Sequence, residues 1–129
     1  MENVISKTLL LPLYFRATDA KNKESILNDK ISLEIVKDFE FDEELMKKAK
    51  FSQAGTIIRA KFFDDCAKNF IKNNPNPVIV NMATGLDTRT LRIYDEKAKF
   101  FDVDLPEVIE LRKKYIKDKS IVLSANVFE

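Results

Sequence analysis

Apolar residues recur at helical spacing in the first half of the chain. One segment carries Ile31, Ile35 and Phe39 at steps of four, and a longer segment continues the same spacing with Ala54, Ile58, Phe62, Cys66 and Phe70. Steps of three to four residues place side chains on one face of a helix, because a helix turns once in about 3.6 residues. The pattern therefore predicts two amphipathic helices.

A short helix is predicted between these two segments. Asp42 stands where an N-cap is expected, since its carboxylate can accept hydrogen bonds from the first backbone N–H groups of a helix. The helix would run through Leu45 toward the lysines at positions 47, 48 and 50, whose positive charge suits the C-terminal end of the helix dipole.

A segment rich in asparagine and proline, residues 73–77, separates the helical half from a region with a different pattern. It is followed by Val78-Ile79-Val80, a run of β-branched residues that predicts a strand buried on both faces. Phe100, Phe101 and Val103 predict a second strand, and the apolar run at residues 121–123 predicts a third. This half of the chain is therefore expected to form a sheet.

The segment between the last two strands is predicted to be a helix. Pro106 suits the first helical turn, and the apolar residues after it keep helical spacing at Val108, Leu111 and Tyr115. Strand, helix and strand in succession make a βαβ unit with parallel strands. The predicted fold class is α/β: a partial Rossmann-like, doubly wound parallel sheet with an N-terminal helical extension. The helical extension is assigned to residues 1–74 and the first βαβ units to residues 75–129.

Composition excludes several classes of function. The 22 basic and 21 acidic residues nearly cancel, so no strong field attracts nucleic acid or an anionic membrane. The apolar run from Leu9 to Leu13 is interrupted by Pro12 and followed by Arg16, which makes it too short and too polar for a signal peptide or a membrane span. The chain has no histidine, which excludes a His-based triad, a His general base and a His-containing metal site. We expect no metal, nucleic-acid or membrane partner.

Cys66 is the single cysteine and cannot form an internal disulfide. It lies on the face of a predicted helix, which indicates a structural residue with a free thiol in a reducing compartment. We therefore expect a cytoplasmic protein.

A loop of small residues follows the first predicted strand. Residues 81–89 read Asn-Met-Ala-Thr-Gly-Leu-Asp-Thr-Arg and begin at the carboxyl end of the strand, where open α/β sheets bind ligands. Small side chains let a nucleoside approach the backbone, and the N–H groups of the turn can point at a carboxylate or phosphate. With one glycine instead of three, the loop does not match the dinucleotide fingerprint, and taken alone it is more often an ordinary βα turn.

Two acids end the second predicted strand. Asp102 and Asp104 follow Gly85 by 17 and 19 positions, a separation at which an acid can accept hydrogen bonds from a ribose diol. A cap for the helix that follows is an equal alternative for Asp104. Strand alternation places both acids on one face, with Asp102 nearer the sheet interior and Asp104 nearer the ligand crevice. A structural role is therefore favoured for Asp102.

These motifs resemble those of a known family. Residues 85–89, Gly-Leu-Asp-Thr-Arg, and residues 102–108, Asp-Val-Asp-Leu-Pro-Glu-Val, are similar to the paired signature of the leucine carboxyl methyltransferase family of class I O-methyltransferases. The resemblance extends upstream through residues 8–16 and the helix bearing Arg59, and downstream to residues 124–127. It covers nearly the whole chain.

The resemblance implies S-adenosylmethionine as the cofactor. The loop around Ala83 and Gly85 would lie against its methionine and ribose portions, and Asp104 would bind the ribose hydroxyls. Arg59 would hold the cofactor carboxylate, a task that suits a planar guanidinium because it pairs both carboxylate oxygens.

Two further positions complete the implied cofactor site. Asn126 matches a position near the adenine. The amide oxygen of Asn126 can accept a hydrogen bond from the adenine amino group. Arg16 matches a basic residue near the cofactor, although a surface arginine is an equal alternative there. The resemblance assigns no catalytic residue, because the cofactor itself carries the reactive group.

The implied activity is methyl transfer to a carboxylate or hydroxyl oxygen of a small molecule or a protein C-terminus. A second hypothesis is a truncated, non-catalytic or split methyltransferase fragment that needs a complementary chain, because relatives continue beyond the third predicted strand. The strand edge left exposed also favours a homo-oligomer. A nicotinamide-dependent dehydrogenase would share the architecture but ranks last, because the loop lacks the glycines that such enzymes need.

Overall fold

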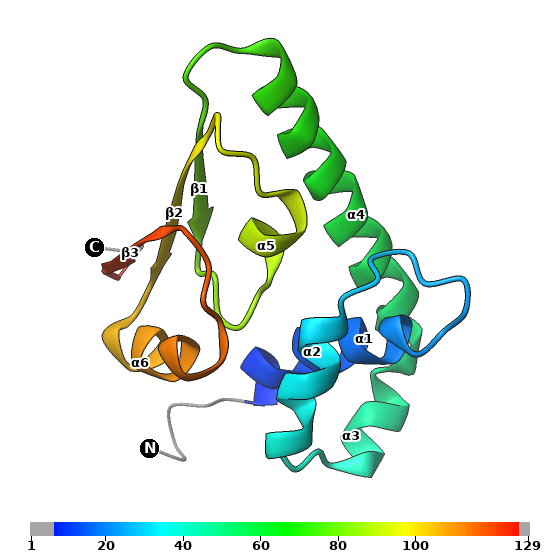
Figure 1. The fold of residues 1–129 in the computed structure, drawn as a ribbon. Coiled ribbons are helices and arrows are strands. Elements are labelled where there is room, and N and C mark those ends of the chain that lie inside the picture. Colours follow the sequence, from blue (N-terminus) through cyan, green and yellow to red (C-terminus); the bar gives the residue numbers. More distant parts are fainter. Residues whose placement is uncertain (1–6, 127–129) are drawn as a thin grey trace. The chain divides into compact units, whose positions relative to one another are not determined.

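The computed structural model describes residues 7–126, which form two compact units, residues 7–63 and residues 64–126. The first unit is helical and contains α1 (Lys7–Ala20), α2 (Lys30–Ile35), the 3-10 helix η1 (Val36–Asp38), α3 (Glu43–Lys48) and the first part of α4 (Lys50–Asn73) (Figure 1). The second contains the rest of α4, β1 (Val78–Met82), α5 (Arg89–Ile93), β2 (Lys99–Asp104), α6 (Pro106–Tyr115) and β3 (Ile121–Ser124).

The apolar pattern alone does not predict α1, because Pro12 lies inside this helix. A proline in a helix interior removes one backbone hydrogen bond and clashes with the preceding turn. Burial offsets that cost: Leu13, Phe15 and Ala17 are all buried, and α1 packs against α2. Packing therefore stabilises a helix that its local sequence disfavours.

Two aspartates cap the short helices of the first unit. Oδ1 of Asp42 accepts hydrogen bonds from the backbone N–H groups of Glu44 at 3.0 Å and Leu45 at 3.2 Å, which confirms the predicted N-cap of α3. In the same way, Asp29 caps α2 by accepting a hydrogen bond from the backbone N–H of Ser32 at 3.1 Å. Both caps satisfy backbone donors that have no partner within the helix.

α4 confirms the helix predicted for residues 54–70, but the predicted apolar face is exposed. The exposed side chains are those spaced by four: Ala54, Ile58, Phe62, Cys66 and Phe70. The buried positions of α4 lie seven residues apart and are Ile57, Asp64 and Ile71. Seven residues make almost two full turns, so these positions share one face, whereas repeated steps of four drift around the helix.

The three predicted strands are present and form a parallel sheet in the order β1-β2-β3. Ile79 pairs with Phe100, and Asn81 pairs with Asp102. On the other side of β2, Asp104 pairs with Ser124 of β3. The carboxyl ends of all three strands therefore meet at one edge of the sheet, as the βαβ prediction requires.

One face of the sheet is covered and the other is exposed. A buried cluster on the covered face contains Ile71 of α4, Ile93 of α5 and Phe100 of β2. The prediction that the first strand is buried on both faces is wrong for the described residues, since Val78 and Val80 are 49% and 52% exposed. Asp102 shares the face of Phe100 by strand alternation and accepts a hydrogen bond from Arg112 of α6, so α4, α5 and α6 all contact this face of the sheet.

The prolines do not coincide with the boundary between the two compact units. Pro77 is buried, and its carbonyl accepts a hydrogen bond of 2.9 Å from the backbone N–H of Lys99 at the start of β2. The compact units divide between Phe63 and Asp64, inside α4. The division into domains at residues 74 and 75 stays a prediction.

Candidate functional site

The loop after β1 has an unusual backbone. Ala83 and Gly85 both adopt left-handed conformations, with φ of 52° and 53°. The backbone N–H of Thr84 donates to the carbonyl of Val103 at 3.1 Å, and the N–H of Asp87 donates back to the carbonyl of Thr84 at 2.9 Å. The loop is therefore a tight turn tied to the end of β2. Glycine adopts this conformation at little cost, but an alanine in it is strained.

Asp104 is the side chain that closes this turn. Its Oδ2 accepts a hydrogen bond of 2.7 Å from the backbone N–H of Gly85, and its Oδ1 accepts one of 2.8 Å from the N–H of Leu105. The N-cap of α6 is Leu105, and no side chain makes a capping hydrogen bond there. The structure therefore decides against the helix-cap alternative for Asp104.

The end of β3 lies beside the same acid. The backbone N–H of Ala125 donates to the carbonyl of Asp104 at 2.9 Å, and the next residue, Asn126, is exposed. Four of the six residues predicted to bind the cofactor thus lie at the carboxyl edge of the sheet: Ala83, Gly85, Asp104 and Asn126. This edge is where ligands of open α/β sheets bind.

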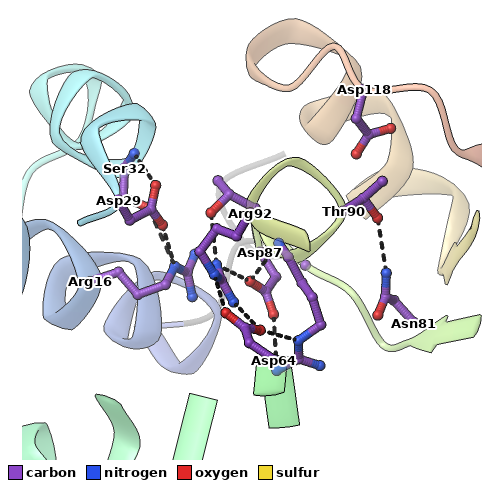
Figure 2. A network of polar contacts seen from close by, with 12 residues as sticks. Arg16, Asp29, Ser32, Asp64, Asn81, Asp87, Thr90, Arg92 and Asp118 are labelled. Atoms are coloured by element: carbon purple, nitrogen blue, oxygen red, sulfur yellow. Dashed lines mark hydrogen bonds and ion pairs between the residues drawn. The ribbon is translucent and has the colours of Figure 1, made fainter. Parts of the chain in front are cut away.

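The two predicted arginines belong to the helical unit. Arg59 is exposed on α4. Arg16 on α1 is buried, and its Nε donates to Oδ2 of Asp29 at 3.1 Å and to Oγ of Ser32 at 3.3 Å (Figure 2). Arg16 is therefore tied to the capped start of α2. The roles of both arginines toward a cofactor stay predictions.

Asp102 is a buried structural acid, as its place in the strand predicts. It is 0% exposed, and its Oδ1 accepts hydrogen bonds from Nδ2 of Asn81 at 2.8 Å and from Oγ1 of Thr90 at 3.3 Å. Asn81 also donates to Oγ1 of Thr90 at 3.0 Å (Figure 2). These contacts join β1, β2 and the start of α5. They therefore connect the elements on either side of the loop after β1.

Arg112 forms an ion pair with the buried Asp102, and the sequence pattern did not predict this arginine as part of the site. Its Nη2 donates to Oδ2 of Asp102 and to Oδ2 of Asp118, each at 3.1 Å. Its Nη1 donates to the backbone carbonyls of Gly85 and Asp87. Its burial could have been predicted from its spacing. Arg112 follows the apolar Val108 by four residues and therefore shares the buried face of α6.

Asp118 is the second acid on Arg112, and its surroundings favour its charged form. Burial alone would raise the pKa of the Asp118 carboxyl, but hydrogen bonds from Ser120 and the charge of Arg112 lower it below its ordinary value. The oxygen Oδ1 of Asp118 accepts a hydrogen bond of 3.1 Å from the backbone N–H of Ser120. The loop between α6 and β3 is thereby fixed to the buried arginine.

A second ion network, also missed, joins α4 to α5. Asp64 accepts hydrogen bonds from Nε of Arg89 at 2.9 Å and from Nε of Arg92 at 2.7 Å. Nη1 of Arg92 reaches Oδ1 of Asp87 at 2.9 Å (Figure 2). Burial would lower the pKa of the Arg92 guanidinium, but its hydrogen bonds and the charges of Asp64 and Asp87 outweigh burial and raise it. Asp64 lies far from the motif in sequence, so spacing could not reveal this partner.

The described residues limit the chemistry at this edge. Residues 7–126 contain no cluster of acidic or cysteine side chains able to hold a metal ion. They also contain no helix that is long and apolar enough to span a membrane. A glycine turn beside a half-buried carboxylate is suited to hold a hydroxylated ligand, because the carboxylate accepts hydrogen bonds from a diol.

Comparisons with known proteins give matches over most of the chain. A family model described as leucine carboxyl methyltransferase matches residues 10–128. The tetracenomycin polyketide synthesis O-methyltransferase TcmP of Streptomyces glaucescens is 29% identical over 116 residues, which are 89% of this chain and 43% of that protein. The S-adenosyl-L-methionine-dependent methyltransferase dpfgK of Gibberella zeae is 30% identical over 122 residues, which are 87% of this chain and 41% of that protein.

A third match is shorter. A putative S-adenosyl-L-methionine-dependent methyltransferase of Mycobacterium sp. (strain KMS) is 36% identical over 62 residues, 47% of this chain and 20% of that protein. The chain thus spans about two fifths of the length of the first two relatives. Both of those alignments nevertheless cover most of this chain, so they include the loop after β1 and the end of β2.

Proposed function

Because this chain belongs to the leucine carboxyl methyltransferase family, we propose that it carries the cofactor site of an S-adenosylmethionine-dependent methyltransferase. The observation that carries the proposal is the hydrogen bond of 2.7 Å between the backbone N–H of Gly85 and Oδ2 of Asp104. It joins the two motifs of the family signature at the sheet edge where such folds bind ligands. The two longest matches, TcmP and dpfgK, are named as methyltransferases.

The donor set at this edge fits the cofactor. Each oxygen of Asp104 accepts one backbone hydrogen bond, whereas a carboxylate has about four acceptor sites, so capacity remains for the two ribose hydroxyls. The left-handed turn at Ala83 and Gly85 presents backbone rather than bulky side chains, which lets the methionine and ribose portions approach. Asn126, exposed after β3, would accept a hydrogen bond from the adenine amino group.

The helical unit contributes the remaining predicted contacts. Arg59 would pair with the cofactor carboxylate through its exposed guanidinium. Arg16 is the second arginine assigned to the cofactor, and its side chain is held by Asp29 and Ser32. Both assignments rest on the match to the family, since each arginine is carried by a helix of the first unit.

The reaction proposed is transfer of a methyl group to an oxygen. S-adenosylmethionine, when bound, supplies the activated methyl group. The residues of this chain would bind and orient it, which lowers the barrier by reducing the entropy lost on reaching the reactive geometry. No general base is assigned to this chain. Oxygen as the acceptor is supported by the name of TcmP, an O-methyltransferase, and the acceptor would be a carboxylate or hydroxyl of a small molecule or a protein C-terminus.

Calorimetric titration with S-adenosylhomocysteine tests the proposal. The wild-type chain is expected to bind it, and Asp104→Ala is expected to bind at least about tenfold more weakly, a loss of about 1.4 kcal/mol. Glu107→Ala is the matched control, because it removes an exposed carboxylate three residues away on α6. Absence of wild-type binding, or binding of a nicotinamide dinucleotide but not of S-adenosylhomocysteine, would reject the proposal.

A second candidate function is that of a fragment completed by another polypeptide segment. One face of the sheet leaves Val80, Met82 and Leu123 between 45% and 63% exposed, and parallel sheets are normally covered on both faces. Relatives are more than twice as long as the part matched here. Light scattering tests the idea: self-association that Val80→Lys abolishes would support a homo-oligomer, and a monomer that binds no S-adenosylhomocysteine would favour the need for a complementary chain.

A further inference from the structure

Arg112 joins the loop after β1 to the buried acids of the sheet unit. Its Nη1 donates to the backbone carbonyls of Gly85 at 3.1 Å and Asp87 at 2.6 Å. Its Nη2 donates to Asp102 and Asp118, each at 3.1 Å. We propose that Arg112 is a positioning residue that sets the backbone conformation of residues 85–87 and thereby the affinity of the loop for its cofactor. The second part of this inference rests on the proposed function.

The loop needs such a support because its backbone is strained at Ala83 and is free to adopt other conformations at Gly85. Ala83 and Gly85 both have positive φ, and a non-glycine residue in that conformation costs about 1–2 kcal/mol. Strained backbones persist where surrounding contacts over-determine them. Gly85 is held at both ends of the residue, since its N–H donates to Asp104 and its carbonyl accepts from Arg112. These two contacts restrain the two dihedrals that glycine would otherwise leave free.

Only an arginine can make this set of contacts from one position. A guanidinium is planar and carries five N–H donors in a fixed fork, whereas a lysine has one nitrogen at the end of a flexible stem. Two terminal nitrogens of Arg112 serve four oxygens, two on backbone carbonyls and two on carboxylates. The Arg112 side chain is 3% exposed, so solvent does not replace a lost partner.

Asp102 anchors the arginine. Its Oδ1 accepts hydrogen bonds from Asn81 and Thr90, and its Oδ2 accepts one of 2.6 Å from Oγ of Ser120 besides the bond from Arg112. A carboxylate with four donors around it has one orientation, and its charge compensates a guanidinium that burial would otherwise destabilise. Asp102 therefore acts on the loop through Arg112 rather than on a ligand.

The two glycines of the chain make a direct test possible. Labelling with carbonyl-¹³C glycine gives two NMR signals, from Gly55 and Gly85. Gly55 lies on α4 with no atom within 4 Å of an added Cβ, so Gly55→Ala is tolerated and assigns the signals. Arg112→Gln is expected to shift the Gly85 carbonyl signal, because that carbonyl loses its donor, and to leave the Gly55 signal in place. A Gly85 signal that does not move would overturn the proposal.

Calorimetry with S-adenosylhomocysteine tests the effect on binding. We expect Arg112→Gln to weaken binding at least about tenfold, and the control Asp118→Asn to change it less than about threefold, since that control leaves both carbonyl contacts in place. If Arg112→Gln does not fold, Arg112→Lys keeps the charge, loses the fork and is expected to shift the same carbonyl signal. Unchanged affinity in a folded variant would refute the effect on binding. A wild-type chain without affinity would instead reject the proposed function, and the carbonyl signal would then decide the positioning role.

Discussion

The backbone N–H of Gly85 donates a hydrogen bond of 2.7 Å to Oδ2 of Asp104, 19 residues further along the chain. The contact links the loop after β1 to the last residue of β2, so it joins two neighbouring parallel strands at their carboxyl ends. A hydrogen bond to an ionised carboxylate is roughly twice as strong as one between neutral groups. The charge of Asp104 therefore contributes to the order of the loop before any ligand is present.

Asp104→Asn should loosen the loop while keeping the size of the side chain. Loss of the charge weakens the bond from Gly85, by about 1 kcal/mol. Hydrogen exchange of the ¹⁵N-labelled glycine amides measures this, and the Gly85 amide should exchange faster in the variant. The Gly55 amide on α4 serves as the internal control and should be unaffected. Equal exchange of Gly85 in both proteins would contradict the importance of the charge.

Ala83→Gly should stabilise the protein slightly. Ala83 has φ of 52°, and relief of about 1–2 kcal/mol of strain exceeds the added entropy of the unfolded chain, about 0.4–1 kcal/mol. Ala54→Gly, in the exposed part of α4, is the control and should lower the free energy of unfolding by about 1 kcal/mol. Urea denaturation of both variants checks the opposite signs. A loss of stability in Ala83→Gly would show that the left-handed turn is not strained.

The stability contributed by Asp118 should depend on pH in the acid range. Its folded-state pKa is lowered from 3.8 by hydrogen bonds from Ser120 and the charge of Arg112, which together outweigh burial. A lowered pKa contributes stability that is present above the unfolded pKa and is lost as pH falls through the folded pKa. The difference in unfolding free energy between wild type and Asp118→Asn should therefore be constant near neutral pH and shrink below about pH 4. A difference that does not change down to pH 2 would contradict this assignment.

Asp64→Ala should destabilise the sheet unit strongly. The Asp64 side chain is 5% exposed and is the shared partner of Arg89 and Arg92, so its removal leaves two arginine charges beside the single carboxylate of Asp87. The expected cost is about 3–5 kcal/mol in the free energy of unfolding. Adding Arg92→Met to this variant should restore part of the loss, because it removes the more buried of the two arginine charges and leaves Asp87 to pair with Arg89. Chemical denaturation of the single and double variants checks the recovery, and strictly additive losses would speak against coupling.

The two faces of the sheet should respond differently to truncation. Phe100 is 2% exposed on the covered face, and Phe100→Ala should cost about 3–5 kcal/mol. Val80 is 52% exposed on the other face, and Val80→Ala should cost less than about 1 kcal/mol. Thermal unfolding of the two variants gives the comparison. A large loss from Val80→Ala would mean that this face is covered in solution, by a second copy or another segment.

The local sequence pattern was enough to predict most of the secondary structure of the sheet unit and the cap of α3. The runs of β-branched residues predicted β1 and β3, Pro106 predicted the start of α6, and Asp42 predicted the cap of α3, because each depends on neighbouring residues only. The parallel βαβ arrangement then followed from the order of elements. The pairing of a glycine loop with an acid at the end of the next strand was also predicted, since parallel strands end at the same edge.

Tertiary structure decided what depends on residues far apart in the chain. It buried Ile57 and Asp64 on α4 rather than the apolar stripe spaced by four, and it left one face of β1 exposed, although the first three residues of β1 are all apolar. It also brought Arg112 to the carbonyl of Gly85 across a separation of 27 residues. A sequence pattern records which face of an element is apolar, but burial and ion pairing depend on which other elements pack against it. These contacts between distant residues therefore appear only in the folded chain.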